Sequence, residues 1–348
     1  MITRNFLSPL KIAHHPTELL RWINKDDSNS ITVSFDLTLK CNQNCLYCPY
    51  RNNKILEQFD SWENIKNAID KLSMEQIKGI CFTGGGEPLV NKHASEAIEY
   101  AKSKNISVAL VTNGTLLTKN LMNTILSCCD WTRISIDAAS SETYKFLHNS
   151  SKSTFQELLV KIESFVKLKS EIKSKTTIGI AFLTNSNNIN EMTEFAHIAN
   201  SIGVDYFQFR PLQNPSDIDI EIHQRVFWKN IDSIKSKTNC SQLVVNKSKY
   251  DRLISDEKIG INEFCETPFF SFVVGADGNI YACAHHRYRK EFIASNILNN
   301  DWKNERQYYL TNEFARKKTN KCPKFCKNDD LNELLFSIKN SSRHVDFI

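Results

Sequence analysis

Short apolar runs alternate with longer amphipathic segments over the first 212 residues of the chain. Six runs have strand length: residues 31–36, 79–83, 107–112, 132–136, 177–183 and 205–211. Segments of helix length lie between them, with the clearest patterns at residues 64–72, 94–104, 117–128, 154–169 and 189–202. Strands that are apolar on both faces and separated by helices are typical of a parallel sheet covered by helices.

The number of these units indicates how far the sheet closes. Right-handed crossovers place the helices on the outside of a curling sheet. Eight such units close a TIM barrel, and six fall short of it. The pattern therefore predicts an α/β fold, a partial (β/α)6 TIM-like barrel over residues 31–212.

The alternation stops near residue 212, and a different pattern follows. Apolar runs at 271–274 and 280–283 flank the turn residues Ala276-Asp277-Gly278-Asn279, which predicts a β-hairpin. The hairpin segment is too small to build a sizeable core unaided. The segments outside the barrel are predicted as an N-terminal extension (1–30), a linker with helices and a strand candidate at 242–245 (213–261), a small hairpin domain (262–330), and a C-terminal helix and tail (331–348).

Composition narrows the class of protein. With 44 Lys and Arg against 39 Asp and Glu, the net charge of +5 is mild, and the basic residues form no stripe of the kind that binds nucleic acid. The N-terminus has no apolar signal-peptide core, and no run of 18 apolar residues is present. We therefore expect a cytoplasmic protein that binds neither nucleic acid nor membrane.

The chain contains eleven cysteines, more than packing alone would suggest. Most of them lie in two groups: Cys41, Cys45 and Cys48, then Cys265, Cys283, Cys322 and Cys326. In a reducing compartment, such groups indicate metal sites more often than disulfides. Cys81, within a strand, and Cys128 and Cys129, at a helix end, are expected to pack in the core.

The first group has the spacing C-x3-C-x2-C on the loop after the first strand. Three thiolates can bind three irons of a cubane cluster and leave the fourth iron open. A zinc site is the alternative, but it would need a fourth ligand nearby, and the nearest histidine is His93.

Two further motifs end neighbouring strands of the predicted sheet. Gly84, Gly85, Gly86 and Glu87 follow the second strand, where glycines allow close approach to a ligand and the carboxylate can accept from an ammonium group. Ser135 and Asp137 end the fourth strand two residues apart, so both point to one face and suit a ribose diol. Ligands of parallel α/β folds bind at this carboxyl edge.

Together these motifs resemble the radical S-adenosylmethionine (radical SAM) superfamily over residues 31–212. The resemblance rests on Cys41, Cys45 and Cys48 with the aromatic Tyr47 before the last cysteine, on Gly84–Pro88, and on Ser135 with Asp137. It implies a [4Fe–4S] cluster that binds the amino and carboxylate groups of S-adenosylmethionine and receives electrons from a flavodoxin or ferredoxin-type donor. Reductive cleavage would give a 5′-deoxyadenosyl radical that takes hydrogen from a substrate.

One expected contact of the family has no direct match. Many relatives place an arginine shortly after the fourth strand, against the methionine carboxylate. The corresponding stretch here offers Lys145 or His148, and Arg210 at the end of the sixth strand is a third candidate.

The second cysteine group suits either a fully ligated cubane or a zinc ribbon by chemistry alone. Its spacing, Cys265-x12-Gly278-x4-Cys283 with Cys322-x3-Cys326 beyond, resembles the SPASM and twitch extensions of radical SAM enzymes. Four cysteines are fewer than a SPASM domain carries. The resemblance therefore implies the twitch type, with one auxiliary [4Fe–4S] cluster.

The expected activity is that of a radical oxidoreductase on a small polar metabolite such as a sugar, an aminocyclitol or a nucleotide sugar. The auxiliary cluster would accept the electron. The alternatives are a peptide-modifying maturase or epimerase and, third, a non-enzymatic iron–sulfur or zinc redox sensor. About thirty residues precede the first strand, so a leader-peptide-binding wing is not expected. No residue is assigned as the catalytic acid or base.

Overall fold

A single curved sheet of ten strands organises the protein, in the order β10-β9-β8-β1-β2-β3-β4-β5-β6-β7. The structure is a computed structural model that describes residues 8–25, 30–51, 59, 61–151, 153–213, 216–237, 242–254, 264–312, 322–323, 325–326 and 328–340. The strands are β1 (Thr32–Asp36), β2 (Gly79–Thr83), β3 (Ser107–Thr112), β4 (Cys129–Ser135), β5 (Thr177–Thr184), β6 (Tyr206–Pro211), β7 (Leu243–Val245), β8 (Ser271–Val274), β9 (Asn279–Tyr281) and β10 (Ile293–Asn296).

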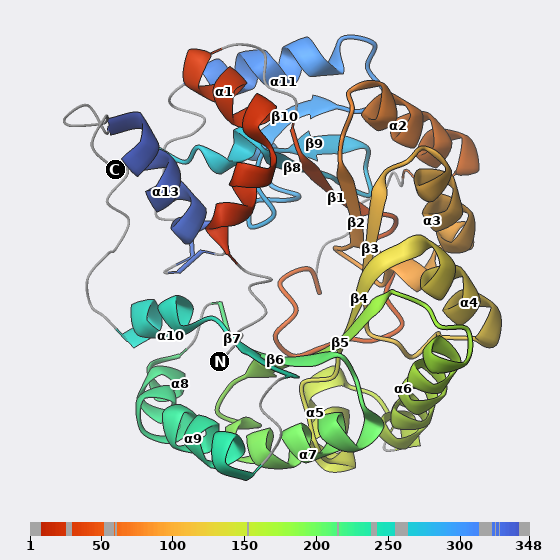
Figure 1. Cartoon of the computed structure of the whole chain (residues 1–348), viewed down its shortest axis with the longest axis vertical. Coiled ribbons are helices and arrows are strands. Elements are labelled where there is room, and N and C mark those ends of the chain that lie inside the picture. Colours follow the sequence, from red (N-terminus) through yellow and green to blue (C-terminus); the bar gives the residue numbers. More distant parts are fainter. Residues whose placement is uncertain are drawn as a thin grey trace.

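The parallel part of the sheet is the predicted partial barrel. Strands β1 to β7 pair in parallel in chain order, and helices cover the convex side of their arc (Figure 1). The helices are α1 (Pro16–Asn24), α2 (Trp62–Met74), α3 (Ala94–Ser103), α4 (Lys119–Cys128), α5 (Ser141–His148), α6 (Ser153–Glu171), α7 (Met192–Ile202), α8 (Asp217–Ile222), α9 (Trp228–Lys237), α10 (Lys247–Ile254), α11 (Trp302–Thr311) and α13 (Asp329–Asn340). The strand candidate at 242–245 is confirmed, as a seventh parallel strand.

The predicted hairpin is present as β8 and β9, but it does not stand apart from the barrel. Strand β8 pairs in parallel with β1, with Thr32 opposite Ser271, and β9 and β10 follow antiparallel. The amides of Ile31 and Thr32 also donate to the Phe270 carbonyl, at 2.8 and 3.2 Å. Backbone bonding therefore joins the C-terminal segment to the first barrel strand.

Alternation along each strand separates two faces of the sheet. On β2, Ile80 and Phe82 are buried in the core that the outer helices cover, so Cys81 between them lies on the inner face. It is half-buried there, instead of packing in the outer core as the sequence suggested. The inner faces therefore carry side chains that the outer core does not use.

The ends of the chain contribute a second, smaller core. Trp22 of α1, Phe270 and Leu335 of α13 are among its buried members. The Trp22 indole donates to the Glu266 carboxylate at 3.1 Å, and the Glu266 amide donates to the Asn332 side chain at 2.8 Å. The predicted extension and C-terminal helix are thus joined next to Cys265. Within the part of the chain that the structure describes, no helix has the length and apolar character needed to cross a membrane.

Candidate functional site

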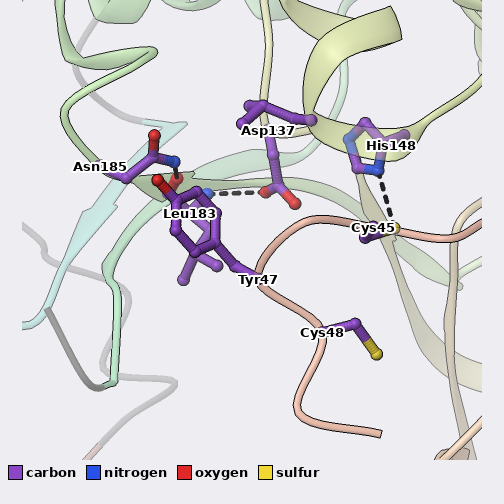
Figure 2. Close-up of a pocket in the computed structure, with 8 residues that line it drawn as sticks. Cys45, Tyr47, Cys48, Asp137, His148, Leu183 and Asn185 are labelled. Atoms are coloured by element: carbon purple, nitrogen blue, oxygen red, sulfur yellow. Dashed lines mark hydrogen bonds between the residues drawn. The ribbon is translucent and has the colours of Figure 1, made fainter. Parts of the chain in front are cut away.

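The cysteine loop leaves β1 and crosses the inside of the strand arc, toward the C-terminal end of α5 (Figure 1). The amides of Asn44 and Leu46 donate to the carbonyls of His148 and Leu147, at 3.3 and 2.8 Å. Helix α5 therefore anchors the loop between its first and last cysteine. A cavity of about 140 Å³ opens beside it, lined by Cys45, Tyr47, Cys48, Asp137, Leu147, His148, Leu183 and Asn185 (Figure 2).

His148 is held between the cysteine loop and the end of β4. Its Nδ1 lies 3.1 Å from the Cys45 Sγ (Figure 2), and its Nε2 lies 2.8 Å from the Ile136 carbonyl oxygen. Because a carbonyl only accepts, Nε2 carries a proton. The ring is 3% exposed, so it fixes the position of Cys45.

The three thiols are free and near one another, as a shared cluster requires. Burial raises the pKa of Cys45, with further contributions from the Asp137 carboxylate and from Cys41 and Cys48. Among the described residues, however, no three His, Cys, Asp or Glu side chains already surround one point. The loop could hold a metal cluster after rotation of these side chains, with deprotonation of the thiols on binding.

The glycine-rich turn after β2 lies directly beneath the cysteine loop. A Cβ on Gly86 would sit 2.3 Å from the Lys40 carbonyl oxygen, and one on Gly85 would sit 2.2 Å from the Leu39 side chain. The Glu87 amide donates to the same Lys40 carbonyl at 3.0 Å. Close packing of two backbones is thus a second reason for glycine here, besides the expected approach of a ligand.

Glu87 is 3% exposed, and its carboxylate joins the ends of β2 and β3. Its oxygens accept from the Thr112 hydroxyl at 2.6 Å, the Asn113 amide at 2.7 Å and the Leu89 amide at 3.1 Å. Burial raises the pKa of this carboxyl, which the three donors oppose. The structure shows a structural role for Glu87, and its contact with an ammonium group stays a prediction.

Ser135 and Asp137 end β4 on the inner face, as their spacing predicted. Asp137 adopts a left-handed backbone, φ 58°, and its Oδ1 accepts from the Leu183 amide at 2.7 Å. Asp137 and Tyr47 both line the cavity (Figure 2). The Tyr47 hydroxyl accepts from the Asn187 amide group at 2.7 Å. Ser135 is half-buried and is not among the lining residues.

The three cationic candidates for a carboxylate contact occupy different places. Lys145 is exposed on α5, and His148 contacts Cys45. Arg210 lies on the inner face of β6, where the positive charge of Arg133 lowers its pKa to about 10. Which of them meets a carboxylate stays a prediction.

The second cysteine group gathers beside the hairpin. Three of its sulfurs accept from N–H groups at 3.4 Å. The donors are the His285 amide for Cys283, the Asn328 amide for Cys326 and the Asn332 side chain for Cys265. The Cys322 Sγ lies 3.4 Å from the Nε2 of His286. Burial raises the pKa of Cys326, and the neighbouring Cys283 and Cys265 add to this. N–H donors to sulfur are a feature of iron–sulfur sites.

Side chains that the sequence analysis did not single out connect the two cysteine groups. The Tyr50 hydroxyl donates to the Ala284 carbonyl at 3.2 Å, so the residues just after Cys48 touch those just after Cys283. Asp36 at the end of β1 pairs with Arg287 at 3.1 Å and accepts from the Tyr288 hydroxyl at 2.7 Å. The partners lie some 250 positions apart in sequence, so no local pattern could have indicated them.

Comparison with known proteins agrees with this geometry. The model of the radical SAM superfamily matches residues 36–197. The mycofactocin maturase MftC of Mycolicibacterium smegmatis is 24% identical over 285 residues, which cover 77% of this chain and 67% of the maturase. The GTP 3′,8-cyclase of Helicobacter pylori is 26% identical over 275 residues, 73% of this chain and 80% of the cyclase.

Solved structures show the same fold. Streptococcus suis SuiB bound to S-adenosylmethionine superposes with a TM-score of 0.63 and 12% identity, covering 88% of this chain and 73% of SuiB. A second structure of SuiB holds the precursor peptide SuiA, with a TM-score of 0.61 at 13% identity over 86% of this chain and 69% of SuiB. The family match and the partial-barrel fold agree: residues 36–197 form a domain of the radical SAM superfamily, whose members use a [4Fe–4S] cluster and S-adenosylmethionine.

Proposed function

We propose that Cys41, Cys45 and Cys48 hold the catalytic [4Fe–4S] cluster and that S-adenosylmethionine binds between their loop and the strand ends. The supporting observation is that three free thiols lie on one loop, where Cys45 and Cys48 line a cavity with Asp137 and where the Gly84–Glu87 turn packs against the residue before Cys41. When bound, these groups supply a 5′-deoxyadenosyl radical that abstracts hydrogen from a substrate.

The residues of the chain give this chemistry its geometry. His148 holds Cys45, and α5 holds the loop backbone. Tyr47 and Asp137 line the cavity beside the cysteines, where Asp137 is oriented by the Leu183 amide and can accept from a ribose hydroxyl. The packing of Gly86 under Lys40 keeps the loop against the turn, so the cysteines and the turn act as one binding surface.

We further propose that Cys265, Cys283, Cys322 and Cys326 hold an auxiliary [4Fe–4S] cluster and that the reaction is oxidation of a small polar metabolite. The N–H donors to three of these sulfurs support a cluster. The contact between Tyr50 and Ala284 supports electron transfer, because it brings the chain next to one cysteine group against the chain next to the other.

Peptide modification is the second candidate. It is favoured by the likeness to the mycofactocin maturase and by the structural likeness to SuiB, one structure of which holds a precursor peptide. It predicts that hydrogen is taken from a peptide side chain or backbone. The oxidation proposal predicts a small-molecule donor.

Two cysteine variants test the cofactor assignment. The anaerobically reconstituted chain is expected to contain about eight irons, and Cys41→Ala and Cys283→Ala about four each. Only the first should abolish reductant-dependent release of 5′-deoxyadenosine. Cys128→Ala, at the end of α4 outside both groups, is the matched control and should behave as the wild type. A colourless protein that retains zinc would contradict the assignment.

The substrate class is decided by isotope transfer. Deuterium from labelled metabolite pools or from labelled peptides is followed into 5′-deoxyadenosine. Transfer from a sugar or nucleotide-sugar pool supports the oxidation proposal, and transfer from peptides alone supports the maturase.

A further inference from the structure

Two arginines project into the inside of the strand arc, Arg133 from the middle of β4 and Arg210 from the carboxyl end of β6. Arg133 lies on β4 between Thr132 and Ile134, both fully buried on the outer face, and Arg210 follows Phe209 of the outer core on β6. Because side chains alternate along a strand, both arginines point to the inner face. Both residues are half-buried.

The strand between them has a glycine, with no side chain, at the level of Arg133. Arg133 is in register with Gly179 of β5, and Gly179 with Tyr206 of β6. A Cβ on Gly179 would lie 2.1 Å from the Tyr206 ring, so that ring covers the glycine. The Nη1 of Arg133 donates across the same strand to the Gln208 Oε1, at 3.4 Å. Glycine at this position lets side chains of β4 and β6 meet over β5.

Their positive charge has no carboxylate partner within ion-pair distance among the described residues. Asp137 acts on Arg210 from further away, and its Oδ1 already accepts from the Leu183 amide. The Nε of Arg133 is buried and donates to no group of the described chain. The Arg133 guanidinium reaches Gln208, which lies two residues before Arg210 on the same face of β6, so the two guanidinium groups are neighbours. In agreement, the charge of Arg133 is the main cause of the lowered pKa of Arg210.

We propose that Arg133 and Arg210 bind an anionic group of the substrate, a phosphate or a carboxylate, inside the barrel. Two neighbouring guanidinium groups repel each other in a half-buried site, and an oxyanion between them removes that repulsion. It also accepts from the unpaired Nε, in the charge-assisted geometry that arginine forms with phosphate and carboxylate. The substrate class is then an anionic small molecule, a step that rests on the proposed function of the site.

The carboxylate of S-adenosylmethionine is the other source of such an anion, and the test separates the two. Inorganic phosphate and acetate are titrated into the full, cluster-loaded chain at constant ionic strength, with thermal unfolding as the readout. Phosphate or acetate should raise the unfolding temperature of the wild type more than chloride does. Arg133→Gln should weaken that binding about tenfold to a hundredfold. Arg133→Lys should recover part of it.

The matched control is Arg225→Gln, because Arg225 lies on the surface with a 70% exposed side chain. It should respond to phosphate as the wild type does. If Arg133→Gln does not fold, the wild-type titration and Arg133→Lys still decide the matter. The absence of any anion effect beyond that of chloride in the wild type would overturn the proposal.

Binding of S-adenosylmethionine to the same variants assigns the anion. Unchanged affinity in Arg133→Gln places the anion on the substrate, and a loss of tenfold or more assigns the arginines to the cofactor and overturns the inference. If the chain makes no 5′-deoxyadenosine but phosphate still stabilises it through Arg133, the proposed function fails while the anion site stands.

Discussion

Asp36→Asn tests whether the buried ion pair at the end of β1 joins the hairpin segment to the barrel. Asp36 is 0% exposed and Arg287 is 8% exposed. The carboxylate accepts from Arg287 at 3.1 Å, from the Tyr288 hydroxyl at 2.7 Å and from the Gly85 amide at 3.1 Å. An amide keeps the shape of the side chain but removes its charge and one acceptor, so the Arg287 guanidinium is left buried without its counter-charge.

The structure sets the expected size of the effect. Removal of one partner of a buried ion pair costs about 3–5 kcal/mol because the other charge stays buried. With the usual unfolding entropy per residue, a chain of this length should lose about 4–7 °C in unfolding temperature. The Tyr50 ring still faces the guanidinium at 5.5 Å, which makes the lower half of that range the more reasonable expectation.

Urea and thermal unfolding of the single and double variants measure it. Arg287→Gln alone should also destabilise the fold, because it leaves the Asp36 carboxylate buried without its counter-charge. The double variant should lose less than the sum of the two, because neither charge is then left alone. Asp232→Asn, with a 77% exposed side chain, is the surface control and should unfold as the wild type does. Additive losses, or single variants that unfold as the control does, would refute the reasoning.

Three further changes test neighbouring parts of the fold. Gly86→Ala, whose Cβ would lie 2.3 Å from the Lys40 carbonyl oxygen, should lower the iron bound per chain while the circular dichroism stays that of a folded protein. Gly179→Ala must displace the Tyr206 ring and should cost about 1–3 kcal/mol in urea unfolding, as overpacking does. Although burial raises it, hydrogen bonds from neighbouring serines hold the pKa of Asp219 below its usual value. Because its pKa is lower in the folded chain than in the unfolded one, the ionised carboxylate stabilises the fold at neutral pH, and this stabilisation is lost as the pH falls. Asp219→Asn should therefore cost about 1–2 kcal/mol at pH 7. The variant should also lose less stability than the wild type does below about pH 4.

The strands could be predicted from the sequence because their buried outer faces leave short, mostly apolar runs between segments of helix length. Five of the six expected barrel strands agree with the structure to within one residue, from β1 to β6. Strand β4 begins three residues before the predicted start, at Cys129, because the sequence analysis assigned Cys128 and Cys129 to the end of the preceding helix. Helix α5 was missed because its eight residues, SETYKFLH, are too few to show a period, although Ser140 caps it by accepting from the Thr143 amide.

In the candidate site too, features with a local sequence pattern could be predicted and those that depend on distant residues could not. Cysteine spacing and strand-end positions are local features, so the loop and the Ser135–Asp137 pair could be found. The structural role of Glu87 depends on donors of β3, and the partner of Asp36 lies 251 positions away, so neither has a local signal. The position of Cys81 did have a local signal, because Ile80 and Phe82 on either side of it occupy the outer face.

The alternation that places Cys81 on the inner face also indicates where this chain can distinguish between substrates. Alternate residues in the middle of a barrel strand face the outer core, and on β4 and β6 these include Thr132, Ile134, Phe207 and Phe209, all buried. The other half faces the interior, where cofactor chemistry constrains only the residues at the strand ends. Arg133 lies two positions before Ser135 and thus one layer deeper than the proposed cofactor site, and Gln208 and Gly179 lie around it. A substrate that reaches this layer meets positive charge first, so exchange of Arg133 for a neutral residue should change which molecules are accepted before it changes how the radical is made.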